Sequence, residues 1–373
     1  MFCMFFYTLR IEEINGAPVP GVRGLFYSLS FFMALLASAP LRVLHLLNIS
    51  FFLNNLLVFA VNFLLYGVLF YVFQVCAEAA AERLKQGRRL LRGSELIILS
   101  VLLALLFSAC LVLRRDVGRY EVTEHSMPLR NLPEELDGLR IVLAADLHVG
   151  WYSREVYIKK AAELINAQNP DIIIMAGDFV FREGEASFHK AAGWLKTLKP
   201  NIALLGVLGN HDNWQGREFA LSILPESGLE FLDNRRVFLN TDRRLQQEIP
   251  ERGLCLAGVG DEWTDSVDFE AALGGVREDM PRIVVSHIPD VVFDVRTSHR
   301  IDLMVSGHTH GGQIVLPCFG PLGMSTSYGE KLLKGWGRDT YYPVYINVGL
   351  GETVLPFRYG VRPEITVFEL RRE

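Results

Sequence analysis

Cysteine is scarce in this sequence of 373 residues, which contains five cysteines and no Cys-x-x-Cys pair. A disulfide framework or a thiolate zinc site needs several cysteines at short, regular spacings, so neither is expected. Cys3, Cys76 and Cys110 lie in or near apolar stretches, which leaves Cys255 and Cys318 in the remainder. One bridge between these last two remains open, so cysteine usage does not identify the cellular compartment.

The sequence also lacks a surplus of positive charge. It contains 37 Lys and Arg against 42 Asp and Glu, which gives a formal net charge of -5. Proteins that bind the phosphate backbone of nucleic acids usually carry an excess of basic side chains on the binding face. We therefore expect no nucleic-acid partner.

Long hydrophobic runs, in contrast, are present in the first third of the chain. Residues 24–41, 49–75 and 96–113 are uncharged, and they approach or exceed the roughly 18 to 20 residues that a membrane-spanning helix requires. Buried helices of a large soluble protein are the alternative, and a cleavable signal peptide fits less well because charged residues interrupt the first 23 positions. We expect a membrane region with about three transmembrane helices over 1–113, a linker over 114–138 and a globular domain over 139–373.

The basic residues in the short loops predict the orientation of this membrane region. Five of them crowd the segment between the second and third runs: Arg83, Lys85, Arg88, Arg89 and Arg92. That loop is expected in the cytoplasm, so an integral protein of the cell (inner) membrane would carry its globular domain on the outer face. Three further basic residues favour the opposite orientation, namely Arg114, Arg115 and Arg119. A different number of spans would also place the globular domain on the other side of the membrane.

Short apolar runs in the globular part end repeatedly at polar residues. The runs are 140–145, 171–176, 202–208, 282–286 and 301–306, and the polar residues that follow are Asp146, Asp178, Asn210, His287 and His308. Runs of this length and composition are typical of buried strands. The sequence therefore predicts five strands, each with a polar side chain just beyond its carboxyl end.

Helix-like segments over 153–168 and around 187–198 separate some of these strands, so we expect a layered α/β domain. Strand ends of such sheets meet at one edge, where sites usually lie. The polar residues should therefore converge, although they are more than 160 positions apart in the sequence. Two further strands, within 341–369, are expected to close a second sheet.

Read in order, the polar residues form the motifs Asp-x-His (146–148), Gly-Asp (177–178), Gly-Asn-His-Asp (209–212), a lone histidine (287) and Gly-His-Thr-His (307–310). This order resembles the calcineurin-like metallophosphoesterase family over about 138–373. The chain further resembles a membrane-attached branch of this family, which includes bacterial phosphodiesterases and a UDP-2,3-diacylglucosamine pyrophosphatase. This narrower resemblance lies in the segments 307–313 and 287–290 and in the apolar N-terminal region. The resemblance implies a four-layer β-sandwich flanked by helices and preceded by transmembrane helices.

The resemblance also implies a set of metal ligands. Asp146, His148 and His310 would hold one divalent ion, Asn210, His287 and His308 would hold a second, and Asp178 would bridge the two. Two such ions can lower the pKa of a shared water and stabilise charge on the attacking and leaving oxygens. Carboxylate, amide and imidazole ligands suit manganese, iron or zinc, and the sequence does not choose among them.

Two residues are expected to be catalytic without being ligands. By resemblance His211 points at the substrate, where its imidazole would neutralise the phosphoryl group or protonate the leaving oxygen. Asp212 would orient His211, although a structural role in the turn is an equal alternative. The remaining histidines (His45, His125, His189 and His299) match no motif and are expected at the surface or in packing.

The expected function is hydrolysis of a phosphodiester or pyrophosphate bond by a membrane-anchored metal enzyme. A lipid-linked substrate is expected, and UDP-2,3-diacylglucosamine is the most specific candidate. A broad-specificity phosphodiesterase without a lipid substrate remains an alternative, as does a non-catalytic membrane receptor or scaffold. Apolar and basic residues after His310, together with Arg358 and Arg362, are candidates for contacts to the substrate.

Overall fold

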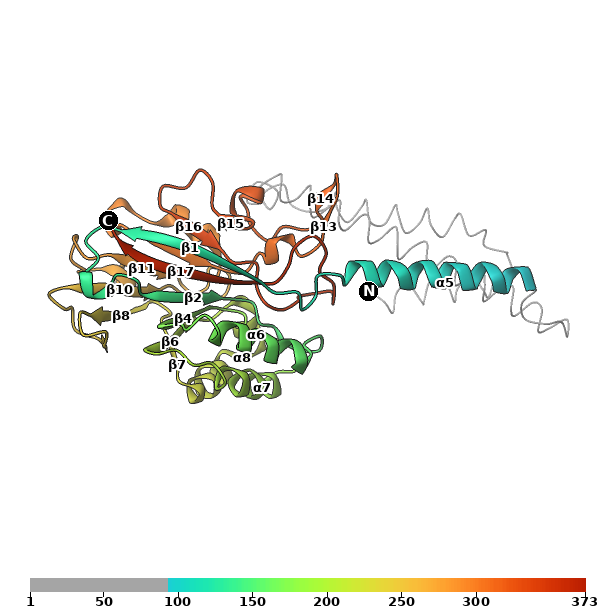
Figure 1. Cartoon of the computed structure of the whole chain (residues 1–373), viewed down its shortest axis with the longest axis horizontal. Helices are drawn as coiled ribbons and strands as arrows, with labels where there is room; N and C mark the ends of the chain where they lie inside the picture. Colours follow the sequence, from blue (N-terminus) through green and yellow to red (C-terminus); the bar gives the residue numbers. More distant parts are fainter. Residues whose placement is uncertain (1–92) are drawn as a thin grey trace, which may run out of the picture. The chain divides into compact units, whose positions relative to one another are not determined.

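A computed structural model describes residues 93–373 of the chain (Figure 1). The expected spans at 24–41 and 49–75 lie outside these residues. The third, at 96–113, lies in helix α5 (Gly93–Leu113), whose leucines at 102, 103, 105 and 106 are exposed. Within 93–373, no helix is long and apolar enough to cross a membrane. The membrane region therefore stays a prediction.

All five expected strands are present, and three of them lie in a six-stranded sheet. The order of this first sheet is β1 (Glu121–Leu129), β17 (Glu364–Arg372), β2 (Arg140–Ala144), β4 (Ile172–Ala176), β6 (Ala203–Val207) and β7 (Leu229–Phe231). The strands from β2 to β7 are parallel to one another, whereas β17 is antiparallel to β2.

The other two expected strands lie in a second sheet of seven strands. Its order is β15 (Gly335–Trp336), β16 (Val344–Ile346), β12 (Leu303–Ser306), β11 (Arg282–Val285), β10 (Gly253–Gly258), β8 (Arg235–Asn240) and β9 (Leu245–Gln246). Strands β10, β11, β12 and β16 run parallel, with antiparallel partners toward both edges.

Helices cover the outer faces of the two sheets. Figure 1 shows α6 (Glu155–Asn166), α7 (Glu185–Leu195) and α8 (Asn210–Ile223) together beside the first sheet. Their apolar side chains join one face of β2 and β4 in a common cluster. The short helix α9 (Phe269–Leu273) packs in the same way on the second sheet.

Residues from both sheets meet in a third cluster between them. Ile141 and Ile174 of the first sheet contact this cluster together with Val285 and Val305 of the second. Side chains alternate between the two faces of a strand, so each central strand supplies both the inner and an outer cluster. The layers are therefore helix, sheet, sheet and helix, which confirms the mixed α/β architecture.

The remaining elements are short and lie in the connections. They are two pairs of strands, β3 (Val149–Gly150) with β5 (Val180–Phe181) and β13 (Val315–Leu316) with β14 (Gly320–Pro321), and six 3-10 helices at Glu134–Leu136, Leu224–Ser227, Pro289–Asp294, Thr297–His299, His310–Gly312 and Gly329–Leu332.

Two expectations about the ends of the domain need correction. Residues 114–138 are not simply a linker, because they include β1, which pairs with β17 at nine positions. The two strands near the C-terminus do not share a sheet, since β16 joins the second sheet and β17 lies between β1 and β2 in the first. Alternation of polar and apolar residues predicts a strand, but it does not identify the neighbouring strand.

Candidate metal centre

The carboxyl ends of five parallel strands bring the predicted ligands together. In the first sheet, β2 is followed by Asp146 and His148, and β4 by Asp178, while α8 begins at Asn210 just after β6. In the second sheet, β11 is followed by His287, and β12 by His308 and His310. All seven side chains are buried.

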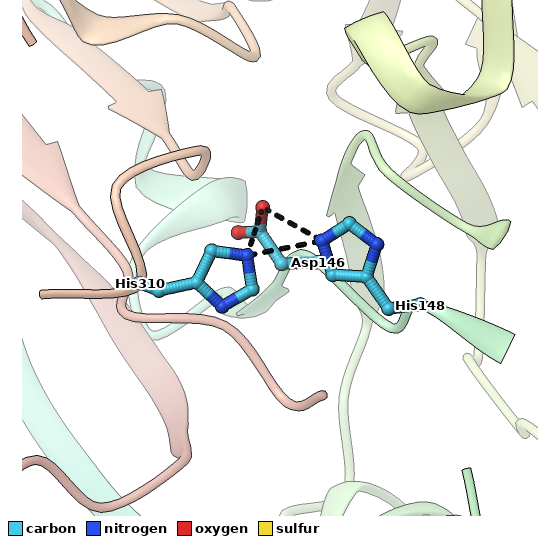
Figure 2. Close-up of side chains that lie close together, drawn as sticks. All are labelled: Asp146, His148 and His310. Atoms are coloured by element: carbon cyan, nitrogen blue, oxygen red, sulfur yellow. Dashed lines mark hydrogen bonds and ion pairs between the residues drawn. The ribbon is translucent and has the colours of Figure 1, made fainter. Parts of the chain in front are cut away.

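One group of ligands consists of Asp146, His148 and His310 (Figure 2). The two imidazoles approach through their Nε2 atoms, which are 3.0 Å apart. Oδ1 of Asp146 lies 3.4 Å from Nε2 of His310 and 4.0 Å from Nε2 of His148. Figure 2 shows the side chain of His310 facing those of Asp146 and His148, which come from the loop after β2. Each offers one lone pair there, which is the arrangement that holds a metal ion.

The second group consists of Asp178, Asn210, His287 and His308. Oδ1 of Asn210 lies 3.1 Å from Nε2 of His287 and 3.1 Å from Nδ1 of His308. Oδ2 of Asp178 is 3.3 Å from Nε2 of His287. The same oxygen is 3.5 Å from His148 in the first group. Asp178 thus stands between the two groups, as a bridging carboxylate must.

The backbone at the ligands is unusual. Five of the seven have a positive φ: Asp146 (50°), His148 (47°), Asp178 (56°), His308 (70°) and His310 (50°). A residue with a Cβ adopts this left-handed region at a cost, and such residues tend to persist where the surroundings enforce them, as at functional sites. The strand ends therefore hold these side chains in directions that ordinary extended backbone would not allow.

Two motif glycines leave room for ligands from other strands. A Cβ added to Gly209 would collide with the carboxylate of Asp178, and one added to Gly307 would lie 2.6 Å from Oδ2 of Asp146. The glycines that precede Asn210 and His308 are therefore required by close approach, because a larger residue would displace a neighbouring ligand.

Burial determines the charge state of most imidazoles. It lowers the pKa of His148 and of His308 to about 3 and that of His310 well below its ordinary value, so these rings are neutral at pH 7. His287 behaves differently. Burial alone would lower its pKa, but the carboxylates of Asp178 and Asp146 outweigh this effect and raise it to about 10.

The carboxylates show the complementary effect. Burial, reinforced by the nearby charge of Asp178, raises the pKa of Asp146 to about 7. Two buried carboxylates, one amide oxygen and four imidazoles converge here. Oxygen and imidazole donors of this kind suit a borderline divalent cation, which would offset the cost of burying the carboxylates. The residues therefore fit the metal ions that the sequence predicts.

His211 is more accessible than the ligands. Its ring is partly exposed and lies against His148, Phe181 and Trp214, at centroid distances of 4.9, 5.2 and 5.0 Å. Its backbone N–H donates to Oδ1 of Asp178, and burial lowers the pKa of its imidazole. The ring also lies close enough to His148 and Asp178 for these three to hold an ion. It thus stands at the mouth of the centre, where a substrate can reach it.

Asp212 does not orient His211. Its Oδ1 accepts hydrogen bonds from the backbone N–H groups of Phe179 and Val180, and its Oδ2 accepts one from Gly209. The carboxylate is fully buried at the first turn of α8 and joins the loops after β4 and β6. The alternative role, a structural carboxylate in the turn, is the one that the hydrogen bonds support.

Arg358 is also different from the expectation. Its guanidinium is fully buried and donates to the carbonyl oxygens of Val348, Gly349 and Gly351, and its Nη2 lies 3.1 Å from Nδ1 of His310. It supports the loop beside the centre from within, so it is not placed to contact a phosphate. Arg362 is exposed.

The segment after His310 is only partly available to a substrate. Leu332 and Leu333 are buried, whereas Phe319 is 85% exposed. Lys331 is paired with Asp339 at 2.9 Å. Part of this segment therefore packs into its own domain.

Several minor expectations can be compared with the structure. Cys255 and Cys318 are free. His189 is exposed, His299 hydrogen-bonds Glu270, and His125 packs against aromatic rings. The sequence reasoning missed Trp214 and Trp263, which are exposed beside the centre. The sequence did offer a signal for both, because Trp214 closely follows the Asn-His-Asp motif and Trp263 lies in the loop after a strand.

Comparison with known proteins agrees with this geometry. Residues 139–312 match the family model described as calcineurin-like phosphoesterase. The chain is similar to the uncharacterized metallophosphoesterase YkuE of Bacillus subtilis, with 31% identity over 253 residues, which cover 67% of this chain and 85% of that protein.

Two further relatives illustrate the range of this group. The phosphodiesterase YaeI of Escherichia coli is 28% identical over 258 residues, 68% of this chain and 90% of its own length. A transmembrane protein with a metallophosphoesterase domain from Danio rerio is 29% identical over 283 residues, 72% of this chain. The match spans 62% of that longer relative.

Proposed function

We propose that this chain, which belongs to the calcineurin-like phosphoesterase family, is a membrane-anchored enzyme that uses two divalent metal ions to hydrolyse a phosphodiester or pyrophosphate bond of a lipid-linked substrate. The family places the chain among the hydrolases of phosphoester bonds. The observation that carries the proposal is the convergence of all seven ligands where the carboxyl ends of strands from both sheets meet.

Asp146, His148 and His310 would hold one ion, Asn210, His287 and His308 the other, and Asp178 both. When bound, the ions supply Lewis acidity and a nucleophile at neutral pH. The protein holds the ligands in fixed directions on strand ends, and it places His211 at the mouth. There the imidazole of His211 donates a hydrogen bond to a phosphoryl oxygen or a proton to the leaving oxygen.

Three observations support the phosphodiester bond and the membrane. The name of the YaeI relative includes phosphodiesterase, and that of the Danio relative includes transmembrane. The three apolar runs in 1–113 have the length of membrane spans. Anchoring raises the local concentration of an enzyme at the bilayer, so a lipid-linked phosphoester such as UDP-2,3-diacylglucosamine is the proposed substrate class, and the domain is proposed to face outward.

A non-catalytic receptor is the weaker candidate. A protein that no longer needs its metals would be free to lose ligands, whereas here none of the seven is replaced.

Turnover of a simple phosphodiester tests the proposal. The full chain, purified in detergent and supplied with Mn²⁺, is expected to hydrolyse bis(p-nitrophenyl) phosphate. His211→Ala should lower kcat by about 10²-fold or more, since general acid catalysis typically contributes 10²- to 10⁴-fold. The exposed His189 provides the matched control, because His189→Ala removes an imidazole remote from the ligands. Equal activity of the two variants would contradict the role of His211.

Two further experiments address the substrate and the orientation. Lipid extracts incubated with the Mn²⁺-loaded enzyme should yield water-soluble phosphorylated products that EDTA abolishes. Accessibility of a reporter fused at the C-terminus should show the domain outside the cytoplasm. A reporter that is accessible from the cytoplasm would contradict the proposed orientation.

A further inference from the structure

Two exposed tryptophans lie side by side at the edge of the metal centre. Trp214 is 56% exposed and Trp263 is 49% exposed. Their ring centroids are 6.4 Å apart, with an angle of 31° between the planes. The ring of Trp214 contacts that of His211, and the rings of Trp263 and His308 have centroids 4.5 Å apart. A substituent that extends from the phosphorus on this side of the centre would therefore lie over the two indoles.

The segments that carry the tryptophans are tied to each other. Nδ2 of Asn213 donates to Oγ1 of Thr264 at 2.7 Å, and Arg217 forms an ion pair with Asp265 at 2.9 Å. These two contacts join the first turns of α8 to the loop after β10. None of the four residues is a metal ligand, and their contacts hold the two segments that carry the indoles against each other.

A second set of hydrogen bonds shapes the loop around Trp263. Oδ1 of Asp261 accepts from the backbone N–H groups of Trp263 and Thr264 and from Oγ1 of Thr264. The loop is therefore organised before any ligand arrives. Large apolar side chains that are both exposed and held in place are typical of binding surfaces, because rigid aromatic groups lose little entropy on binding.

The charges nearby restrict the chemistry of the group that this surface can take. Oδ2 of Asp261 is buried and has no hydrogen-bond partner among the described residues, whereas Glu262, the next residue in the loop, is exposed. Carboxylates accept N–H donors but repel anions, and a hydrocarbon chain would have to displace their water. A planar heterocycle with N–H groups matches both the indole faces and the acceptors.

We propose that Trp214 and Trp263 form an aromatic platform that binds a nucleobase carried by the phosphoester substrate. The inference rests on the proposed function and narrows its substrate class to a nucleotide-bearing phosphoester. Stacking on aromatic side chains requires only a π face, so the platform favours nucleobases as a class without selecting one base.

Two substrates that share a leaving group compare a nucleoside substituent with a small alkyl substituent, and the tryptophan variants then assign the contribution of the base. Thymidine 5'-(p-nitrophenyl phosphate) carries a base, and ethyl p-nitrophenyl phosphate does not; in each, water adds to phosphorus and p-nitrophenol leaves. The measured quantity is the ratio of the two kcat/KM values for the Mn²⁺-loaded full chain. We expect a ratio of about ten or more, because stacking contributes roughly 1 to 3 kcal/mol per base.

Trp214→Ala and Trp263→Ala should each lower this ratio about tenfold, whereas Trp214→Phe and Trp263→Phe should retain most of it. Trp151 provides the control. It is 59% exposed but lies against Arg182, and it contacts neither of the two indoles. Trp151→Ala should therefore leave the ratio unchanged. A wild-type ratio near one, or the same ratio in all variants, would overturn the platform.

A binding measurement separates this inference from the proposed function. Uridine 5'-monophosphate should quench the tryptophan fluorescence of the full chain more strongly than it quenches the double variant Trp214→Ala/Trp263→Ala, and ribose 5-phosphate should quench neither. If both esters resist hydrolysis but this quenching difference is present, the proposed activity is wrong and the platform stands. Equal quenching of wild type and double variant would refute the platform whether or not the enzyme turns over.

Discussion

The two sheets contribute different chemistry to the same centre. The loops of the first sheet supply both carboxylates and the amide, in Asp146, Asp178 and Asn210, whereas the three ligands from the second sheet are all imidazoles. The backbone N–H of His308 donates to the carboxylate of Asp146, so the two sets are also joined directly. The difference shows that neither sheet forms a metal site alone, and that packing between the sheets is a condition for catalysis.

The largest expected effect comes from the ligand that serves both halves. Asp178→Ala removes the bridging carboxylate, and we expect kcat to fall by about 10³-fold or more, because the metal ions contribute several kcal/mol of charge stabilisation. Metal content, measured by elemental analysis, should fall at both positions.

His287→Ala is the comparison from the second sheet. It removes a ligand of one ion, so about one metal per chain should remain. Equal metal content in the Asp178→Ala and His287→Ala variants would show that Asp178 does not bridge, and it would remove the proposed difference between the sheets.

A smaller effect should separate catalysis from architecture on the first sheet. Asp212→Ala leaves three buried backbone N–H groups without an acceptor. The free energy of unfolding should fall by about 3 kcal/mol, as expected for several unsatisfied buried donors. Thermal or urea denaturation of the full chain measures this loss.

Asp268 offers a matched carboxylate on the side of the second sheet. It caps α9 by accepting one hydrogen bond, from the backbone N–H of Ala271 at an exposed position. Asp268→Ala should cost only about 1 kcal/mol. A change in the pH profile of kcat/KM for Asp212→Ala, with stability unaffected, would restore the orienting role for Asp212.

The clustering of the candidate ligands is predictable from the sequence because each of them follows a strand whose apolar run is easy to recognise. The strands at 172–176 and 303–306 end where they were expected to end and begin one or two residues later than expected. Within each sheet, their convergence follows from the rule that parallel strands share a carboxyl edge. The motif glycines can also be recognised in the sequence, because they directly precede the ligands Asn210 and His308.

Other features depend on contacts that no local pattern contains. The segment of β1 is charged and includes Pro128, so it resembles a linker until its pairing with β17 is known. Asp212 and Arg358 are polar residues beside the site, and only their hydrogen-bond partners show that they support backbone. The platform of Trp214 and Trp263 joins two loops from different sheets, and for that reason it was not predicted.

The smallest expected effect concerns pH and tests the imidazole side of the comparison. In the metal-free protein the pKa of His287 is raised to about 10, and that of Asp146 to about 7. Between pH 7.5 and 9 Asp146 is mostly ionised and His287 is still protonated, so a metal ion must displace one proton from His287. Affinity should therefore rise by up to about tenfold per pH unit in this window, as measured by competition with a chelator.

The stability of the metal-free protein should move in the opposite direction as pH rises. Protonated His287 contributes stability that is fully present below its unfolded pKa near 6.5 and is lost as pH rises toward 10. In His287→Gln both slopes should flatten, because a ligand that cannot be protonated remains, and a metal affinity that is independent of pH in the wild-type chain would show that His287 is already neutral.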